Sequence, residues 1–224
     1  MKRPTPSPDD APEAGTARAR ILSAAVQVLT ERGYGAMRTR EIAARARVSK
    51  RELYSEFRSK DGILGALIAT RAERMRKPLA EADVGDRAGV VATLQRVGVA
   101  FLEQLCAPAV VSMFRLAISS VEHAPAVARI LDQQALRPNA RSLRELMAAG
   151  VRADVLGGEP ARMASRFFAL LVGGIHVKVL LGVTAPPKPR ALRRHVGEVT
   201  EAFLRLHERP PKASRARPRR RSKR

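Results

Sequence analysis

Apolar residues recur every three or four positions along most of the chain, the period of an amphipathic helix. The first such stretch predicts a helix over about 17–32, ended by Gly33. Two short helices follow, over about 39–46 and 49–57, and a longer one begins at residue 60 and stops near Lys77, because Pro78 disfavours helix in the residue before it. Further helices are predicted over about 86–106, 108–122, 125–150 with a break before Pro138, 160–181 and 189–207. No segment alternates apolar and polar residues as a strand would, so the fold class is all-α.

Helix-end signals agree with these bounds. Thr39 is expected to cap its own helix, Ser49-Lys50-Arg51-Glu52 forms an S-x-x-E capping box, and Ser59 is expected to cap the helix that follows. Prolines begin four of the later helices, where the missing amide has no partner within the helix: Pro108, Pro125, Pro160 and Pro189.

The two short helices and their turn form a helix-turn-helix arrangement, which places the start of its second helix in the DNA major groove. Its apolar positions can converge on a small core: Ile42, Ala43, Ala46, Val48, Leu53 and Phe57. On the opposite face Arg51 can fork onto a guanine, Lys50 and Arg58 can neutralise phosphates, and the Tyr54 hydroxyl can donate to a phosphate oxygen. Glu52 either caps the Ser49 amide or accepts from a cytosine amine. The alternative is a plain three-helix bundle with solvated arginines.

The formal net charge is +21, and its distribution matters more than its sum. Residues 16–60 hold 11 basic and 4 acidic side chains, and the much longer segment 61–207 holds 20 and 13. Residues 208–224 hold 9 basic and 1 acidic side chains and form a proline-broken tail, expected to be disordered like the arm 1–15. The dense charge in 16–60 marks a module that faces a polyanion, whereas the tail either adds affinity for nucleic acid or is simply solvated.

Several classes of protein are excluded. Cys106 is the only cysteine, so no intramolecular disulfide or cysteine-rich zinc site can form. The first 15 residues lack the apolar region of a secretory signal, and the uninterrupted apolar stretch 167–177 is shorter than the ~20 residues of a membrane span. The single cysteine and the missing signal predict a cytoplasmic protein, and the short apolar stretch predicts no membrane partner. The histidines lack metal-binding spacing and no glycine-rich phosphate loop occurs, so we expect no enzymatic activity, no cofactor and no metal.

The segment from Thr39 to Asp61, with V-S-K-x-x-L-Y-x-x-F-x-S-K at its centre, resembles the DNA-binding segment of the TetR (tetracycline-repressor) family. The resemblance covers about 17–67 closely, including Gly33-Tyr34, and 68–207 in architecture. It implies that Thr39, Tyr54 and Lys60 contact the DNA backbone and that Lys50, Arg51 and Glu52 lie at or near the bases. The full predicted DNA-binding set is Thr39, Arg40, Ser49, Lys50, Arg51, Glu52, Tyr54, Arg58 and Lys60.

One residue departs from the family pattern. Arg47 stands in the turn where the family usually has glycine. A left-handed conformation costs a residue with a side chain roughly 1–2 kcal/mol. The turn is therefore either strained or shaped differently from that of the family.

The resemblance also implies that 61–207 is a helical domain that binds a small-molecule effector and forms a homodimer. Helix 160–181 is apolar on nearly all sides, so it must be buried on two sides, and Gly173-Gly174 either permits close helix approach or leaves room for a ligand. With helix 189–207 it resembles the pair that builds the family's dimer interface, through Met163, Leu170, Leu171, Leu192, Val196, Val199 and Phe203. The alternative is that both are ordinary core helices of a monomer.

Candidate ligand-pocket residues are Cys106, Met113, Phe114, Phe167, Phe168, Gly174 and His176, although methionine and aromatic residues at helical spacing also suit a plain core. Segments around Met113, Val127 and Leu143 are similar to the AefR-like group of C-terminal domains. The sequence thus predicts a ligand-responsive dimeric repressor that reads a palindromic double-stranded DNA operator with helix 49–57. The alternative function is nonspecific nucleic-acid binding, or binding to anionic membranes, mainly through the tail.

Overall fold

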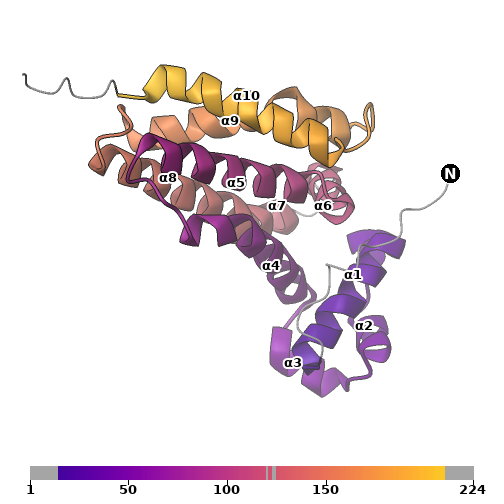
Figure 1. The fold of residues 1–224 in the computed structure, drawn as a ribbon. Helices are drawn as coiled ribbons and strands as arrows, with labels where there is room; N and C mark the ends of the chain where they lie inside the picture. The colour runs from indigo at the N-terminus through magenta and orange to yellow at the C-terminus, as the bar shows by residue number, and fades with distance from the viewer. Residues whose placement is uncertain (1–14, 120, 123–124, 210–224) are drawn as a thin grey trace, which may run out of the picture.

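The computed structural model describes residues 15–119, 121–122 and 125–209 and arranges them as helices in two lobes (Figure 1). The all-α class is confirmed; extended pairing in the described residues is limited to one isolated bridge between Leu156 and Glu208. The helices are α1 (Ala17–Ala36), α2 (Thr39–Ala46), α3 (Lys50–Phe57), α4 (Lys60–Ala80), α5 (Arg87–Leu105), α6 (Pro108–Ser119), α7 (Pro125–Leu131), the π-helical turn η2 (Asp132–Leu136), α8 (Arg137–Arg152), α9 (Pro160–Leu180) and α10 (Pro189–His207).

The smaller lobe contains α1 to α3, and α4 leads from it into the larger lobe (Figure 1). The predicted bounds of α2 and of the helix body of α3 are confirmed, and Gly33 (φ 71°) interrupts α1 where its end was predicted. Ser49 and Ser59 cap α3 and α4, since their hydroxyls accept from the amides of Glu52 and Gly62 at 3.1 and 3.0 Å. The cap predicted for Thr39 is wrong: Arg38 occupies the cap position without a side-chain bond.

The ends of two other predicted helices differ from the structure, whereas a predicted break is present. Helix α4 continues past Pro78 to Ala80, because a proline in the last turn removes only one helical hydrogen bond. Helix α6 ends at Ser119 rather than near Glu122. The break expected before Pro138 is present as η2, where the helix widens to π geometry for one turn before α8 begins.

Two buried apolar clusters correspond to the lobes, but the first one crosses the predicted boundary at residue 60. It combines the α1–α3 core with the first turns of α4 and with side chains of α6 and α7, among them Met113 and Leu131. The second lies between α4, α5, α8, α9 and α10. The small lobe is therefore packed directly against α4, α6 and α7.

Helix α9 bends at Gly173 (φ 40°, ψ −137°). Near this bend a side chain from another helix binds the backbone of α9: His195 Nε2 of α10 donates to the Leu171 carbonyl at 2.9 Å. A side chain inserted among the backbone hydrogen bonds is one of the usual causes of a bend. A Cβ added at Gly173 would meet no atom within 4 Å, and one at Gly174 would meet only the end of the Lys178 side chain. Within a single copy, therefore, no neighbouring helix packs closely against Gly173 or Gly174.

By length and composition alone, α9 could cross a membrane: its most apolar 18-residue window has a mean hydropathy of 1.5. The apolar stretch 167–177 is shorter than this 18-residue window, because the window can include charged residues such as the flanking Arg166 and Lys178. Helices α5 and α6 pass the same test only together, and they are bent by 64° at their junction. In the structure α9 packs against α5, α8 and α10 as a helix of the larger lobe.

Candidate nucleic-acid interface and ligand cavity

Several basic side chains of 16–60 are bound within the small lobe. These are Arg18, Arg20, Arg32 and Arg45. Arg45 of α2 joins this helix to α1 through Glu31 (2.6 Å) and also pairs with Glu41 on its own helix (2.7 Å). Arg20 Nε of α1 donates to the carbonyl of Ala46 at 3.1 Å. The dense positive charge of this segment therefore has two uses: these four arginines, although exposed, interact with other groups of the lobe, and the rest remains on its outer surface.

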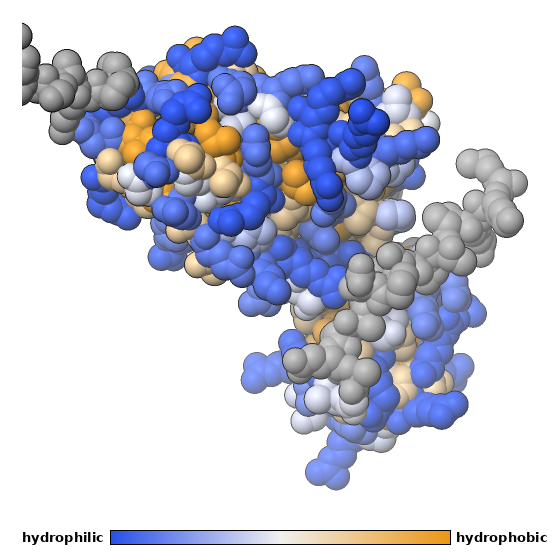
Figure 2. All heavy atoms as spheres, in the orientation of Figure 1, coloured by the Kyte–Doolittle hydropathy of each residue, from blue (hydrophilic) through white to orange (hydrophobic). Residues whose placement is uncertain are grey.

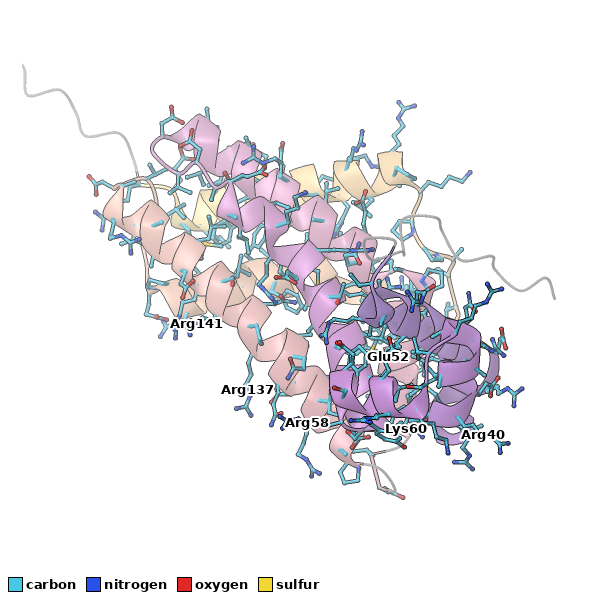
Figure 3. The ribbon with its side chains drawn as sticks, turned by 90° about the horizontal axis from the view of Figure 1, so that it is seen from below. Arg40, Glu52, Arg58, Lys60, Arg137 and Arg141 are labelled. Atoms are coloured by element: carbon cyan, nitrogen blue, oxygen red, sulfur yellow. The ribbon has the colours of Figure 1, made fainter. Side chains whose placement is uncertain are left out.

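The outward-facing part of that charge lies on the two short helices and their ends. It comprises Arg38, Arg40, Arg47, Lys50, Arg51 and Arg58, all exposed. On α3, Leu53 and Phe57 are buried while Lys50, Arg51 and Tyr54 are exposed, which separates a core face from a polar face as the pattern predicted. Figure 3 shows Arg40, Lys60 and Arg58 along one edge of the small lobe, with Arg40 and Arg58 extending away from it.

Thr39 and Tyr54 are brought together although 15 residues separate them. Their hydroxyl oxygens are 3.1 Å apart, and Tyr54 is 44% exposed. The pair connects the start of α2 to the middle of α3 at the surface. One hydroxyl donates to the other in this pair, which leaves the second hydroxyl hydrogen to donate to a phosphate oxygen.

Lys60 is held at the start of α4 by an aromatic ring. Its Nζ lies 4.0 Å from the centroid of Tyr34, and the Tyr34 hydroxyl donates to the carboxylate of Asp61. Burial lowers the pKa of Lys60, with the charge of Arg38 acting in the same direction, and burial together with the Asp61 bond raises the pKa of Tyr34. The Gly33-Tyr34 pair thus positions a lysine of the predicted DNA-binding set.

The turn between α2 and α3 is left-handed at Arg47 (φ 53°, ψ 49°). The amides of Arg47 and Val48 donate to the carbonyls of Ala44 and Ala43, which closes the end of α2. Of the two alternatives for this turn, the structure shows the strained one. As for Glu52, no bond from the Ser49 amide to its carboxylate occurs among the described residues, so only half of the predicted capping box is present.

A cavity of about 850 Å³ lies in the larger lobe, between α4, α5, α6, η2, α8 and α9. Three of the seven predicted pocket residues line it: Met113, Phe114 and Phe168. The other four lie elsewhere. Phe167 packs on Phe203 in the core, with 5.3 Å between the ring centroids. Cys106 is buried in a small cluster with Val111 and Val179. Gly174 is exposed, and His176 lies behind the cavity wall.

His176 contacts the back of the wall rather than the cavity itself. Its ring meets the Phe114 ring edge to face at 5.0 Å between centroids. It is 7% exposed, neither ring nitrogen has a partner among the described residues, and burial lowers its pKa. His176 is therefore a neutral core residue next to the cavity. Burial also raises the pKa of the Cys106 thiol, which keeps that side chain protonated.

Family models match both lobes. Residues 21–67 match the tetR family of bacterial regulatory proteins, and residues 92–209, more than half of the chain, match the C-terminal domain of AefR-like transcriptional repressors. The chain belongs to the TetR family. It is a transcriptional regulator with an N-terminal helix-turn-helix domain.

Individual relatives agree with this assignment. The uncharacterized HTH-type transcriptional regulator YvkB of Bacillus subtilis (strain 168) is 36% identical over 86 residues, which is 38% of this chain and 43% of that protein. The chain thus matches less than half the length of this curated relative. A Mesorhizobium loti MAFF303099 protein described as a TetR-family transcriptional regulator superposes with a TM-score of 0.72 at 20% identity, covering 86% of this chain and 96% of its own. The flavonoid-responsive regulator FrrA gives 0.69 at 24%, covering 89% and 100%.

The residues predicted for the dimer interface of this TetR-family chain are mostly buried inside one copy. Six of the seven are 0–7% exposed, namely Met163, Leu171, Leu192, Val196, Val199 and Phe203, and only Leu170 (38%) reaches the surface. The apolar side chains that α9 and its end do expose are Phe168, Leu170, Val177 and Leu181. Of the seven predicted interface residues, only Leu170 is thus exposed at the surface of a single copy.

Sequence reasoning also missed a group of arginines in this TetR-family fold. Arg71 of α4 and Arg137, Arg141 and Arg144 of α8 all line the cavity. The signal was available, because positions 137, 141 and 144 fall on one face of a helix. Among the described residues, no group of three or more histidine, cysteine, aspartate or glutamate side chains could hold a metal ion.

Proposed function

We propose that this TetR-family regulator is a dimeric repressor that binds a palindromic operator and is released when a small molecule enters the cavity. The observation that carries the proposal is the position of α4. Its face of Ile68, Arg71, Ala72 and Met75 lines the cavity, and its first turns belong to the core of the DNA-binding lobe. A ligand that displaces this face acts on the element that positions the recognition helix.

Two further contacts support the same coupling. Met113 of α6 and Leu131 of α7 line the cavity and belong to the apolar cluster of the small lobe. A close-packed interior transmits a displacement rather than absorbing it. The extent of release is bounded by the difference in ligand affinity between the DNA-binding and released states.

A dimer is supported by the incomplete burial of α9. Only 33% of its most apolar 18-residue window is buried. Leu170, Gly173, Gly174, Val177 and Leu181 are all exposed along α9 and its end, and a Cβ added at Gly173 would meet open space. In a dimer formed through this exposed part of α9, two α3 helices roughly 34–36 Å apart would read successive major grooves.

The effector is an organic molecule rather than a metal or a simple ion, since the cavity wall is mostly apolar. The name of FrrA, a flavonoid-responsive regulator of similar fold, agrees with an organic effector. This function implies a cytoplasmic protein without an enzymatic activity. The basic segment 210–224, part of the predicted tail, lies outside the described residues, whereas Glu208 and Arg209 are bound to the larger lobe through Arg87 and Asp154.

The test is a competition assay at fixed salt between a palindromic duplex, selected on the protein from a random pool, and a scrambled duplex of equal length. We expect a preference of about 10³ or more for the palindrome. Arg51→Gln should reduce this preference about tenfold or more, since one good base contact contributes about 1–3 kcal/mol. Tyr54→Ala should weaken binding to both duplexes, because it removes a phosphate contact. Arg152→Gln, an exposed arginine at the end of α8, is the matched control and should change nothing.

The same assay on a chain ending at Arg209 separates the two functions. The proposed repressor keeps its preference for the palindrome and loses part of the salt dependence, because fewer phosphates are neutralised. Equal affinity for both duplexes would reject the proposal. Loss of all binding in the shortened chain, with full binding by Tyr54→Ala, would favour the nonspecific binder instead.

A further inference from the structure

We propose that the ligand of the cavity is an amphipathic organic anion, with an apolar body and one carboxylate. The inference rests on the proposed function only in taking the cavity as the ligand site. It is carried by the division of the wall into an apolar interior and a cationic side.

The interior of the cavity is formed by buried apolar side chains. Phe101, Leu105, Val110 and Met113 are each 2–6% exposed, and they come from α5 and α6. Phe114 and Phe168 complete this part of the wall. A volume of about 850 Å³ is near the upper end of the ~300–1,000 Å³ of ligand cavities, so the apolar body is much larger than that of a simple acid such as acetate.

The cationic side is formed by α4 and α8. Arg137, Arg141 and Arg144 lie on one face of α8, and Figure 3 shows Arg137 and Arg141 extending from the same side of this helix. Like charges on one helix face repel one another, which an anion bound beside them would relieve. No aspartate or glutamate is among the described residues that line the cavity.

The four arginines differ in what they can offer. Arg137 and Arg141 are 75% and 74% exposed and pair with Asp132 and Glu145 at 2.6 and 2.9 Å, so water and carboxylates already attenuate their charge. Arg71 is 8% exposed on the inner wall, where the attraction between charges is much less screened than in water. A guanidinium matches a carboxylate through two parallel hydrogen bonds. We expect two of the four to bind the carboxylate: Arg71, because it is buried, and Arg144, which is exposed but forms no ion pair among the described residues.

The test uses the full chain without DNA and two sets of probes, each with a constant body. Decanoate is compared with 1-decanol and decyltrimethylammonium, and 4-phenylbenzoate with 4-phenylbenzyl alcohol, by calorimetric titration below any micelle concentration. We expect at least one anion to bind about tenfold or more tighter than its alcohol, the equivalent of one charge-assisted hydrogen bond. The ammonium probe should bind most weakly of its set.

Variants locate the effect. Arg144→Gln should weaken binding of the preferred anion about tenfold and leave its alcohol unchanged. Arg71→Lys keeps the buried charge but removes the bidentate fork, so it should weaken the anion several-fold even if Arg71→Gln does not fold. Arg152→Gln, on the same helix but outside the cavity wall, should change neither affinity.

The outcomes separate this inference from the proposed function. Equal or better binding of both alcohols, tightest binding of the ammonium, or no binding of any probe would overturn it. An anion that binds through Arg144 but does not release operator DNA would support the ligand class and contradict ligand-controlled release. Release of DNA by the alcohols, with no preference for the anions, would support ligand-controlled release and contradict the ligand class.

Discussion

Arg47 carries a backbone conformation that glycine adopts without strain. Its φ of 53° and ψ of 49° put it in the left-handed region, which costs a residue with a Cβ roughly 1–2 kcal/mol. Two backbone hydrogen bonds to Ala43 and Ala44 hold the turn closed there. The side chain is exposed at the surface that bears Lys50 and Arg51. The strain is therefore maintained at the site where an extra positive charge faces the proposed DNA.

This predicts that replacing Arg47 with glycine relieves backbone strain but weakens DNA binding. Arg47→Gly should be about 1 kcal/mol more stable than Arg47→Ala, because both remove the same charge and only alanine keeps the Cβ. Both should bind DNA more weakly than the parent chain, with a smaller salt dependence. Urea unfolding of the two variants measures the first effect. Equal midpoints would show that the turn changes shape when Arg47 is replaced.

At the scale of elements, the junction of α3 and α4 fixes the recognition helix to the cavity lobe. Gly62 lies in the first turn of α4, and a Cβ there would overlap the carbonyl oxygen of Phe57, the last residue of α3. The overlap is with backbone, so it cannot be relieved by a side-chain rotation. The segment from Thr39 to Asp61 that identified the two helices ends one residue before this glycine.

Gly62→Ala is therefore expected to destabilise the chain by about 1–3 kcal/mol and to weaken operator binding, since α3 must move. Gly65→Ala on the same helix is the matched control. An added Cβ there meets Ile130 Cγ2 at an ordinary 3.5 Å, so the variant should gain about 0.5–1 kcal/mol from helix propensity. Thermal unfolding of both variants checks the sign. Similar stabilities would mean that the α3–α4 turn adapts to a side chain.

The elements that sequence predicted well are those set by local chemistry. Ser49 and Ser59 cap helices because a hydroxyl reaches an amide three residues away, a contact that needs no tertiary information. Pro78 was misjudged for the opposite reason. Whether a helix continues one turn beyond a proline depends on the packing of its other residues, which no local signal reports.

Sites built from several helices were predicted less well, because neighbouring residues on a helix point to different sides and the sequence does not show which side meets the site. Phe167 and Phe168 are neighbours with the same chemistry, yet one is fully buried in the core and the other lines the cavity. Leu170 and Leu171 divide in the same way between the surface and the core. The sequence established that α9 is apolar all round, and only the placement of α5, α8 and α10 shows which face is left over.

At the scale of the whole molecule, that remaining face determines the assembly we expect. The larger lobe exposes apolar residues among its polar ones, whereas the small lobe is mainly polar (Figure 2). Val177 (52% exposed) and Leu181 (73%) lie on the side of α9 that the open glycines occupy. Covering them with a second α9 would remove apolar area from water and bring two helices close together at Gly173 and Gly174.

The last prediction follows from this assembly. In solution the 24.4 kDa chain should have the mass of a dimer by light scattering, and Val177→Lys should shift it toward the monomer, because a charge in the seam would be buried without a partner. Ile118→Lys, at an apolar residue of α6 that is 63% exposed, is the control and should remain dimeric. Monomeric Val177→Lys should lose most of its affinity for a full palindrome but little for a single half-site, since only the paired contacts are lost. A Val177→Lys chain that stays dimeric would place the interface on another face of the larger lobe.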